Sequence, residues 1–149
     1  MSDLTFRDYI AQKLIADCER GVRCSPGGQS YEECIAANDT ADVKARIDTF
    51  DTGIKEGRLG YDPDAAERAL AATKEYPCDQ GIELLKLSNS VLTGLVPEGS
   101  DCYAHVECAE VDTTLSGNRY CVDGCTFLTG ETGQKGTCQE SPISTGACP

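Results

Sequence analysis

The chain has 149 residues, a formal net charge of −12, ten cysteines and no tryptophan. This length suits one domain, or one domain with a small appendage. The acidic charge argues against binding to nucleic acid or to anionic lipid, because both require a basic face, and we expect neither partner.

Two helical stretches are predicted near the N-terminus. Apolar residues recur at helical spacing over 5–20, and Thr5 with an acid three residues later is a capping-box pattern. A second stretch over 30–56 begins at a similar pair led by Ser30, and it is expected to break near 38–40.

Two more helices complete the predicted N-terminal domain, 1–92. Asp62 followed by Pro63 is a strong helix start, which predicts a helix over 62–76. A last helix is expected over 81–92. The inner faces of these helices are rich in alanine, so the core is thin and the helices can approach closely.

The remainder, 93–149, loses the helical period. Six of the ten cysteines lie here, with short extended pieces separated by glycine and acidic residues. Such a segment buries little apolar surface and needs covalent or metal support. We therefore predict a mainly α fold: a small antiparallel helical domain with a disulfide-knit, loop-rich C-terminal appendage that contains short β-hairpins.

The even number of cysteines favours full pairing as a disulfide scaffold. In a helical hairpin, the last turn of the first helix lies across from the first turns of the second, which favours Cys18 with Cys34. Alternative pairings remain open in both parts of the chain. The pairs that we expect are Cys18–Cys34, Cys24–Cys78, Cys102–Cys121, Cys108–Cys125 and Cys138–Cys148.

A zinc site in the tail is the competing interpretation of the cysteines. Its ligands would come from Cys102, His105, Cys108, Cys121 and Cys125. The chain has no close Cys-x2-Cys pair, and the other cysteines would stay unexplained. We therefore expect no metal.

Catalytic constellations are not evident. His105 is the only histidine, and the cysteines near it are expected to be oxidised, so a nucleophilic triad has no obvious members. Asp48 and Asp51 resemble the start of a calcium loop, but the glutamate of its twelfth position is missing. We expect no enzyme activity, no catalytic residues and no cofactor.

The cysteines also bear on the compartment, because disulfides persist outside the cytosol. The N-terminus shows neither the basic nor the apolar region of an export signal, so we expect that such a signal has been removed. No apolar run is long enough for a transmembrane helix. The predicted location is extracytoplasmic: secreted, periplasmic or surface-anchored.

Three segments carry a resemblance to a known group. They are the early cysteines between residues 18 and 34, the stretch GRLGYDPDAA at 57–66 that is followed by Pro77-Cys78, and VLTGLVPEGSDC at 91–102. In order and content they resemble cysteine-rich secreted proteins and lipoproteins of myxobacteria and related bacteria, mostly of unassigned function. The tail is similar to the cysteine-rich region of Dickkopf-type proteins. The resemblance implies export, a lipid anchor as an option, and a binding role without catalytic residues.

The expected function is a non-enzymatic, extracytoplasmic structural or protein-binding module stabilised by disulfides. A small secreted enzyme or inhibitor is one alternative. A subunit of a cell-surface assembly is another, and it predicts an exposed apolar patch around Leu84, Leu87 and Leu92. The protein partner and the oligomeric state stay open.

Overall fold

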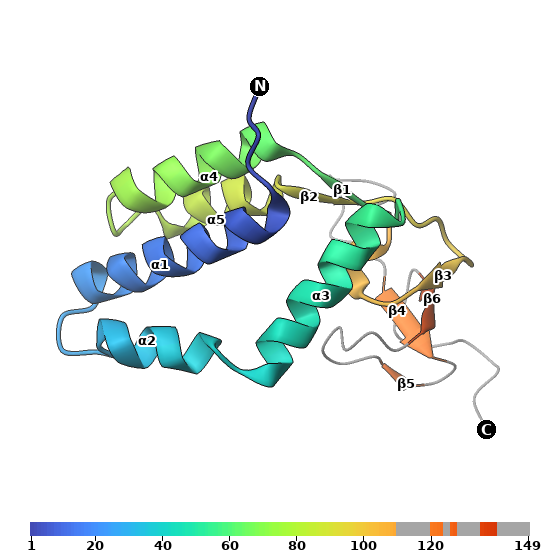
Figure 1. Cartoon of the computed structure of the whole chain (residues 1–149), viewed down its shortest axis with the longest axis horizontal. Coiled ribbons are helices and arrows are strands. Elements are labelled where there is room, and N and C mark those ends of the chain that lie inside the picture. The colour runs from blue at the N-terminus through green and yellow to red at the C-terminus, as the bar shows by residue number, and fades with distance from the viewer. Residues whose placement is uncertain (110–119, 124–125, 128–134, 140–149) are drawn as a thin grey trace. The chain divides into compact units, whose positions relative to one another are not determined.

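The computed structural model is mainly α-helical, with short antiparallel strands in its C-terminal part (Figure 1). The residues that it describes are 1–109, 120–123, 126–127 and 135–139. Among them, no helix combines the length and the apolar character needed to cross a bilayer. Contacts divide the chain into two compact units. The first unit comprises Met1–Val43 and Tyr61–Val91, and the second comprises Lys44–Gly60 and Leu92–Pro149.

Four helices build the first unit. They are α1 (Phe6–Cys24), α2 (Tyr31–Asn38), α4 (Pro63–Glu75) and α5 (Gly81–Asn89). Helix α1 packs against α4 and α2, and α4 also packs against α5 (Figure 1). This is the antiparallel helical arrangement that the sequence predicts.

Side-chain caps fix where these helices begin. The Thr5 hydroxyl accepts a hydrogen bond from the backbone N–H of Asp8 (3.2 Å). Ser30 forms a complete capping box with Glu33. Asp62 caps α4, where proline occupies the first turn. All three predicted starts are confirmed, because each depends only on residues within one helical turn.

Small side chains form the core of the first unit. Five of its buried residues are alanines with at most 4% exposure, and four of them lie on α4; the set is Ala16, Ala65, Ala66, Ala69 and Ala72. Leu70 and Thr73 of α4 are buried beside them. Because alanine buries little apolar area, packing alone contributes modestly to the stability of this unit.

The buried stripe of α1 differs from the expected one. A spacing of four residues predicts an inward face that starts at Phe6 and includes Ile10, with Ile15 beside it. Phe6, Tyr9, Ala16 and Cys18 are the buried positions, whereas Ile15 is 45% exposed. A strict spacing of four drifts around a helix with 3.6 residues per turn, so the packed stripe mixes spacings of three and four.

Helix α5 is likewise rotated from expectation. The apolar spacing of 81–92 predicts that Ile82 and Leu85 face inward. Leu84 is buried instead, and Ile82 is 72% exposed and Leu85 is 60% exposed. A helix this short, with apolar residues on several faces, does not specify its orientation by periodicity alone.

Three aromatic rings meet at the N-terminal end of α1. The Tyr61 ring packs edge-on against Phe6, with centroids 5.7 Å apart, and lies 6.4 Å from the Tyr9 ring. The Tyr61 hydroxyl donates a hydrogen bond to the Leu4 carbonyl (2.9 Å). Burial, with smaller effects from Asp17 and Tyr61, raises the pKa of Tyr9 to about 12.

The raised pKa predicts a loss of stability in alkali. Folded Tyr9 keeps its proton between its ordinary pKa of 10.0 and about 12, whereas unfolded Tyr9 releases it. The free energy of unfolding should therefore fall as pH rises through this window and be unaffected by Tyr9 below it. Absorbance titration of tyrosinate measures the pKa of Tyr9, and denaturant unfolding at each pH measures the free energy of unfolding. The Tyr9→Phe variant has the same disulfides and should lose part of this dependence; an identical profile would contradict the assignment.

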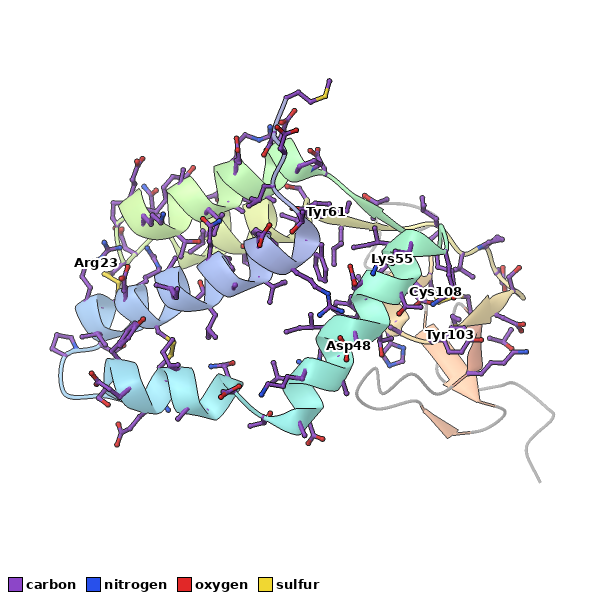
Figure 2. All side chains as sticks on the ribbon, in the orientation of Figure 1. Arg23, Asp48, Lys55, Tyr61, Tyr103 and Cys108 are labelled. Atoms are coloured by element: carbon purple, nitrogen blue, oxygen red, sulfur yellow. A yellow bond between two sulfur atoms is a disulfide. The ribbon has the colours of Figure 1, made fainter. Side chains whose placement is uncertain are left out.

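Two arginines of α1 bind the C-terminal end of α4. Arg20 donates to the carbonyls of Tyr76 (2.5 Å) and Pro77 (2.9 Å). Arg23, labelled in Figure 2, donates to the carbonyl of Lys74 (2.8 Å) and more weakly to that of Tyr76 (3.4 Å). These bonds satisfy helix-end carbonyls that have no partner within the helix. Both arginines lie in the last turns of α1, which continues past its predicted end at residue 20 to Cys24.

Removing these caps should weaken the α1–α4 pair. Arg20→Ala is expected to lower the free energy of unfolding by about 2 kcal/mol, and the more exposed Arg23→Ala by about 1 kcal/mol, because hydrogen bonds from charged donors are lost. Chemical denaturation measures both. Arg68→Ala, at an exposed position of α4, is the control and should change stability by less than about 0.5 kcal/mol. Equal losses at all three positions would contradict a capping role.

The second unit combines one helix with short strands. Most of α3 (Ala41–Lys55) belongs to it, followed by β1 (Leu59–Tyr61), which pairs with β2 (Leu92–Gly94). Gly57 has a φ of +77°, a conformation that favours glycine, and makes the turn between α3 and β1. The expected boundary near residue 92 is one place where the chain passes between the units. Because β1 pairs with β2, the segment 44–60 groups with the later residues.

A second, four-stranded sheet lies in the C-terminal part of the chain. Its strands are β3 (Asp101–Cys102), β4 (Tyr120–Asp123), β5 (Thr126–Phe127) and β6 (Gly136–Gln139), in the order β3-β6-β4-β5 and antiparallel throughout. The last strand in sequence therefore lies between β3 and β4. A 3₁₀ turn, η1 (His105–Glu107), packs against β2 and β4.

Candidate functional site

Two predicted disulfides hold the helices of the first unit. Cys18–Cys34 joins α1 to α2, with a Cα–Cα distance of 5.6 Å, and Cys24–Cys78 joins the end of α1 to the segment after α4, with 5.4 Å. Both predicted pairs are confirmed. Helix α2 has no buried residue of its own, so the first bridge is its main attachment to α1.

The tail pairs its cysteines differently from expectation. Cys108 bonds to Cys138, with a Cα–Cα distance of 5.6 Å. The predicted pairs Cys108–Cys125 and Cys138–Cys148 are therefore wrong. The cause is strand order: β6 inserts between β3 and β4 and brings Cys138 into contact with the residue that follows η1. Cys125 and Cys148 themselves lie outside the described residues.

The predicted Cys102–Cys121 pair stays a prediction. Cys102 is disulfide-bonded and fully buried. Cys121 lies in β4 with its Cα opposite that of Cys138, but its side chain is not among those described.

The alternative zinc ligands are brought together only in part. The sulfurs of Cys102, Cys108 and Cys138 lie within 4.8 Å of one another and are buried. His105 lies in η1, and Cys125 is outside the described residues. All three clustered sulfurs are in disulfides, whereas zinc requires thiolates. In this oxidised form the cluster is a covalent core that also includes Val96.

A buried ion pair lies beside this core. The Glu107 side chain is fully buried, and its Oε2 accepts hydrogen bonds from Arg58 Nε (3.0 Å) and from the backbone N–H of Tyr103 (2.9 Å). The Arg58 guanidinium lies 4.5 Å from the Tyr103 ring centre, and it also pairs with Glu56. We call these four residues the Arg58 cluster.

Backbone bonds hold Arg58 in place. Its N–H donates to the Gly53 carbonyl (2.8 Å), and its carbonyl accepts from the Leu95 N–H (3.0 Å). Within the described residues, Oε1 of Glu107 has no hydrogen-bond partner. A Cβ at Gly53 would lie 3.1 Å from this oxygen, so a larger residue there would require the Glu107 side chain to shift.

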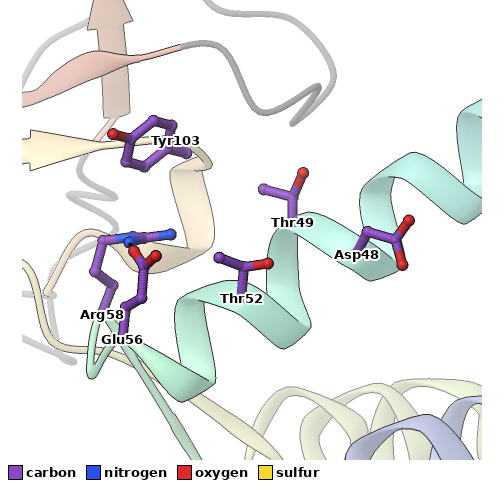
Figure 3. Close-up of a pocket in the computed structure, with 6 residues that line it drawn as sticks. All are labelled: Asp48, Thr49, Thr52, Glu56, Arg58 and Tyr103. Atoms are coloured by element: carbon purple, nitrogen blue, oxygen red, sulfur yellow. Dashed lines mark ion pairs between the residues drawn. The ribbon is translucent and has the colours of Figure 1, made fainter.

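A shallow pocket of about 360 Å³ opens beside the Arg58 cluster (Figure 3). One wall is the face of α3, and the other is Tyr103. The lining residues are Asp48, Thr49, Thr52, Glu56, Arg58 and Tyr103. They offer two carboxylates, two threonine hydroxyls, a tyrosine ring with its hydroxyl and one guanidinium, and none of the six is a histidine or a cysteine.

The pocket bears on the calcium-loop interpretation of the sequence. Asp48 and Asp51 lie within the continuous helix α3, so this interpretation is wrong. Asp48 and Glu56 are eight residues apart, which is about 12 Å along a helix. Calcium binds oxygens at about 2.3–2.6 Å, so one ion does not suit both carboxylates.

Sequence reasoning missed the Arg58 cluster. Arg58 and Glu107 are separated by 49 positions, and no pattern in the sequence pairs them. A fully buried glutamate can be recognised only once its neighbours are known, since glutamate is usually exposed.

The expected apolar patch is also placed differently. Leu84 is buried and Leu87 and Leu92 are half-buried, so the patch around them was predicted wrongly. The exposed apolar side chains of α5 are Ile82 and Leu85.

Comparison of the chain with protein-family models, with curated proteins and with solved structures finds no match.

Proposed function

We propose that this protein is a non-enzymatic, extracytoplasmic protein-binding module that is braced by disulfides. The main observation in its support is the state of the cysteines: each cysteine whose side chain is described is in a disulfide. Such bonds persist in oxidising compartments and are rare in the cytosol. The resemblance of the cysteine pattern to secreted bacterial proteins supports the same location.

The pocket supports binding over catalysis. Its two threonine hydroxyls have no imidazole among the six lining residues to activate them, and its guanidinium is engaged by two glutamates. The Tyr103 ring and the Arg58 guanidinium that line this depression belong to residue types that are enriched at protein–protein interfaces.

Two measurements test this function. Alkylation of the native protein without reductant, followed by mass determination, should find no free thiol among the ten cysteines. The fluorescently labelled protein should bind saturably to the cell envelope or matrix of its source, and a reduced and alkylated sample should not. A reduced chain holding stoichiometric zinc, or binding that never saturates, would refute the proposal.

A second candidate is a subunit of a surface assembly. Ile82 and Leu85 are both largely exposed and lie three residues apart, on one side of α5. Sedimentation of the wild type over a range of concentrations should then show self-association that the double variant Ile82→Ser/Leu85→Ser abolishes. A wild type that remains monomeric would remove this candidate.

A further inference from the structure

Two disulfides lie side by side within the second unit. Cys108 and Cys138 are bonded to each other, and Cys102 is bonded to a different cysteine, so these three sulfurs belong to two separate bonds. The three sulfurs lie within 4.8 Å of one another, and the three residues are at most 5% exposed. In the part of the chain that the structure describes, no other three cysteines lie this close together. A sulfur of one disulfide is therefore next to the other disulfide, in a place that solvent hardly reaches.

Strand pairing puts Cys102 and Cys138 on the same face of the sheet. The Cα of Cys102 lies opposite that of Gly136 in the antiparallel pair β3–β6, and Cys138 is two positions further along β6. Side chains two positions apart on a strand project from the same face. Backbone bonds hold this register: the Cys138 N–H donates to the Ser100 carbonyl (3.0 Å), and the Gly99 N–H donates to the Cys138 carbonyl (2.9 Å). The sheet thus holds the two cysteines close together, although they are not bonded to each other.

We propose that this cluster is a redox switch in which Cys138 changes its partner from Cys108 to Cys102. A dithiol-containing reductase first reduces the Cys102 disulfide: the dithiol becomes a disulfide, and Cys102 and its former partner are released as thiolates. The Cys102 thiolate then attacks the Sγ of Cys138. The Cys102–Cys138 bond forms, the Cys108–Cys138 bond breaks, and the electron pair stays on the Cys108 sulfur, which takes up a proton. This second step consumes no reductant.

The exchange releases the residue that follows Glu107. In the oxidised form, the disulfide of Cys108 ties the turn η1 to β6. After the exchange this turn keeps its backbone bonds to Val96, from the Val96 N–H to the Glu107 carbonyl and from the Ala109 N–H to the Val96 carbonyl (2.8 Å each), but it has lost its covalent link. The redox state of the cysteines therefore controls how firmly Glu107 is held against Arg58. This inference goes beyond the proposed binding function and does not depend on it.

The test maps the disulfides of the intact protein after limited reduction. Dithiothreitol is added in increasing amounts at mildly alkaline pH until the native bond of Cys102 is lost, and the thiols are then alkylated in weak acid. Mass spectrometry of the digested protein should find Cys102 joined to Cys138, with Cys108 alkylated and the Cys108–Cys138 peptide lost. No cysteine of the first unit should appear in a new bond.

A variant without the Cys102 sulfur separates the exchange from direct reduction. It combines Cys102→Ser with serine at the cysteine that mapping finds bonded to Cys102 in the wild type. At the same concentration of dithiothreitol, the Cys108–Cys138 bond should survive in this variant and be lost in the wild type. Equal loss in both proteins would overturn the proposal, because the reductant would then reach this bond directly.

Two outcomes in the wild type would also overturn the switch. One is a Cys108–Cys138 bond that stays intact after the Cys102 disulfide has opened. The other is a set of new bonds spread over many cysteines, which would indicate unfolding instead of exchange between neighbours.

Hydrogen exchange measures the structural effect of the new pairing. In the oxidised form the Glu107 N–H donates to the Ala104 carbonyl (3.2 Å) and the Ala109 N–H to the Val96 carbonyl (2.8 Å). Both amides should exchange faster in the re-paired protein, because the turn has lost its covalent link. Unchanged protection of these amides would overturn the claim that the exchange loosens the turn beside Arg58.

Discussion

Replacing Cys24 and Cys78 together with serine should lower the free energy of unfolding of the first unit by about 4 kcal/mol. The bridge spans 54 residues, and the loss of chain entropy on cross-linking an unfolded loop of that length is of this order. Because the core is largely alanine, little apolar burial is available to offset the loss. Denaturant unfolding, with helical circular dichroism at zero denaturant, measures the effect.

The shorter bridge is the internal comparison. Cys18→Ser/Cys34→Ser opens a loop of 16 residues and should cost about 3 kcal/mol. Its effect should also be local: α2 has no buried residue, so its amides should lose protection from hydrogen exchange before those of α1 and α4. A smaller loss for the longer bridge, or full protection of α2 without its disulfide, would contradict this account.

Breaking the buried ion pair should have the second large effect. Arg58→Met or Glu107→Ala is expected to destabilise the second unit by about 3–5 kcal/mol, because each leaves one charge buried without its main partner. Glu107 is fully buried, and the side chain of Arg58 is only 15% exposed. Urea unfolding followed by the signal of Tyr103, with other tyrosines replaced by phenylalanine, reports on this unit.

A double-mutant cycle separates the pair from its surroundings. Arg58→Met/Glu107→Leu should cost clearly less than the sum of the single changes, since no charge is then left unpaired. The exposed pair Lys86–Glu83 is the matched control, and Glu83→Ala should cost less than about 1 kcal/mol. Additive losses at Arg58 and Glu107 would show that the two side chains are not coupled.

Much of the first unit follows from local chemistry. The helix starts at Thr5, Ser30 and Asp62 are set by hydrogen bonds within one turn, and sequence patterns report such bonds reliably. The Cys18–Cys34 pair follows from a helical hairpin, whose geometry is fixed once its helices are known. The exposure of Ile15 and Ile82 was not predictable from the sequence. Apolar periodicity indicates a helix, but it does not show which neighbouring element covers each face of that helix.

The sequence alone therefore determined the helices, their caps, the fold class and the dependence on disulfides, since all of these follow from short-range patterns and composition. Tertiary structure alone decided the Cys108–Cys138 bond and the Arg58 cluster. The disulfide requires strand β6 to insert out of sequence order, and the Arg58 cluster requires η1 to pack against β2. The pairing of strands far apart in sequence depends on the whole chain, and no local pattern around Glu107 or Cys138 records it.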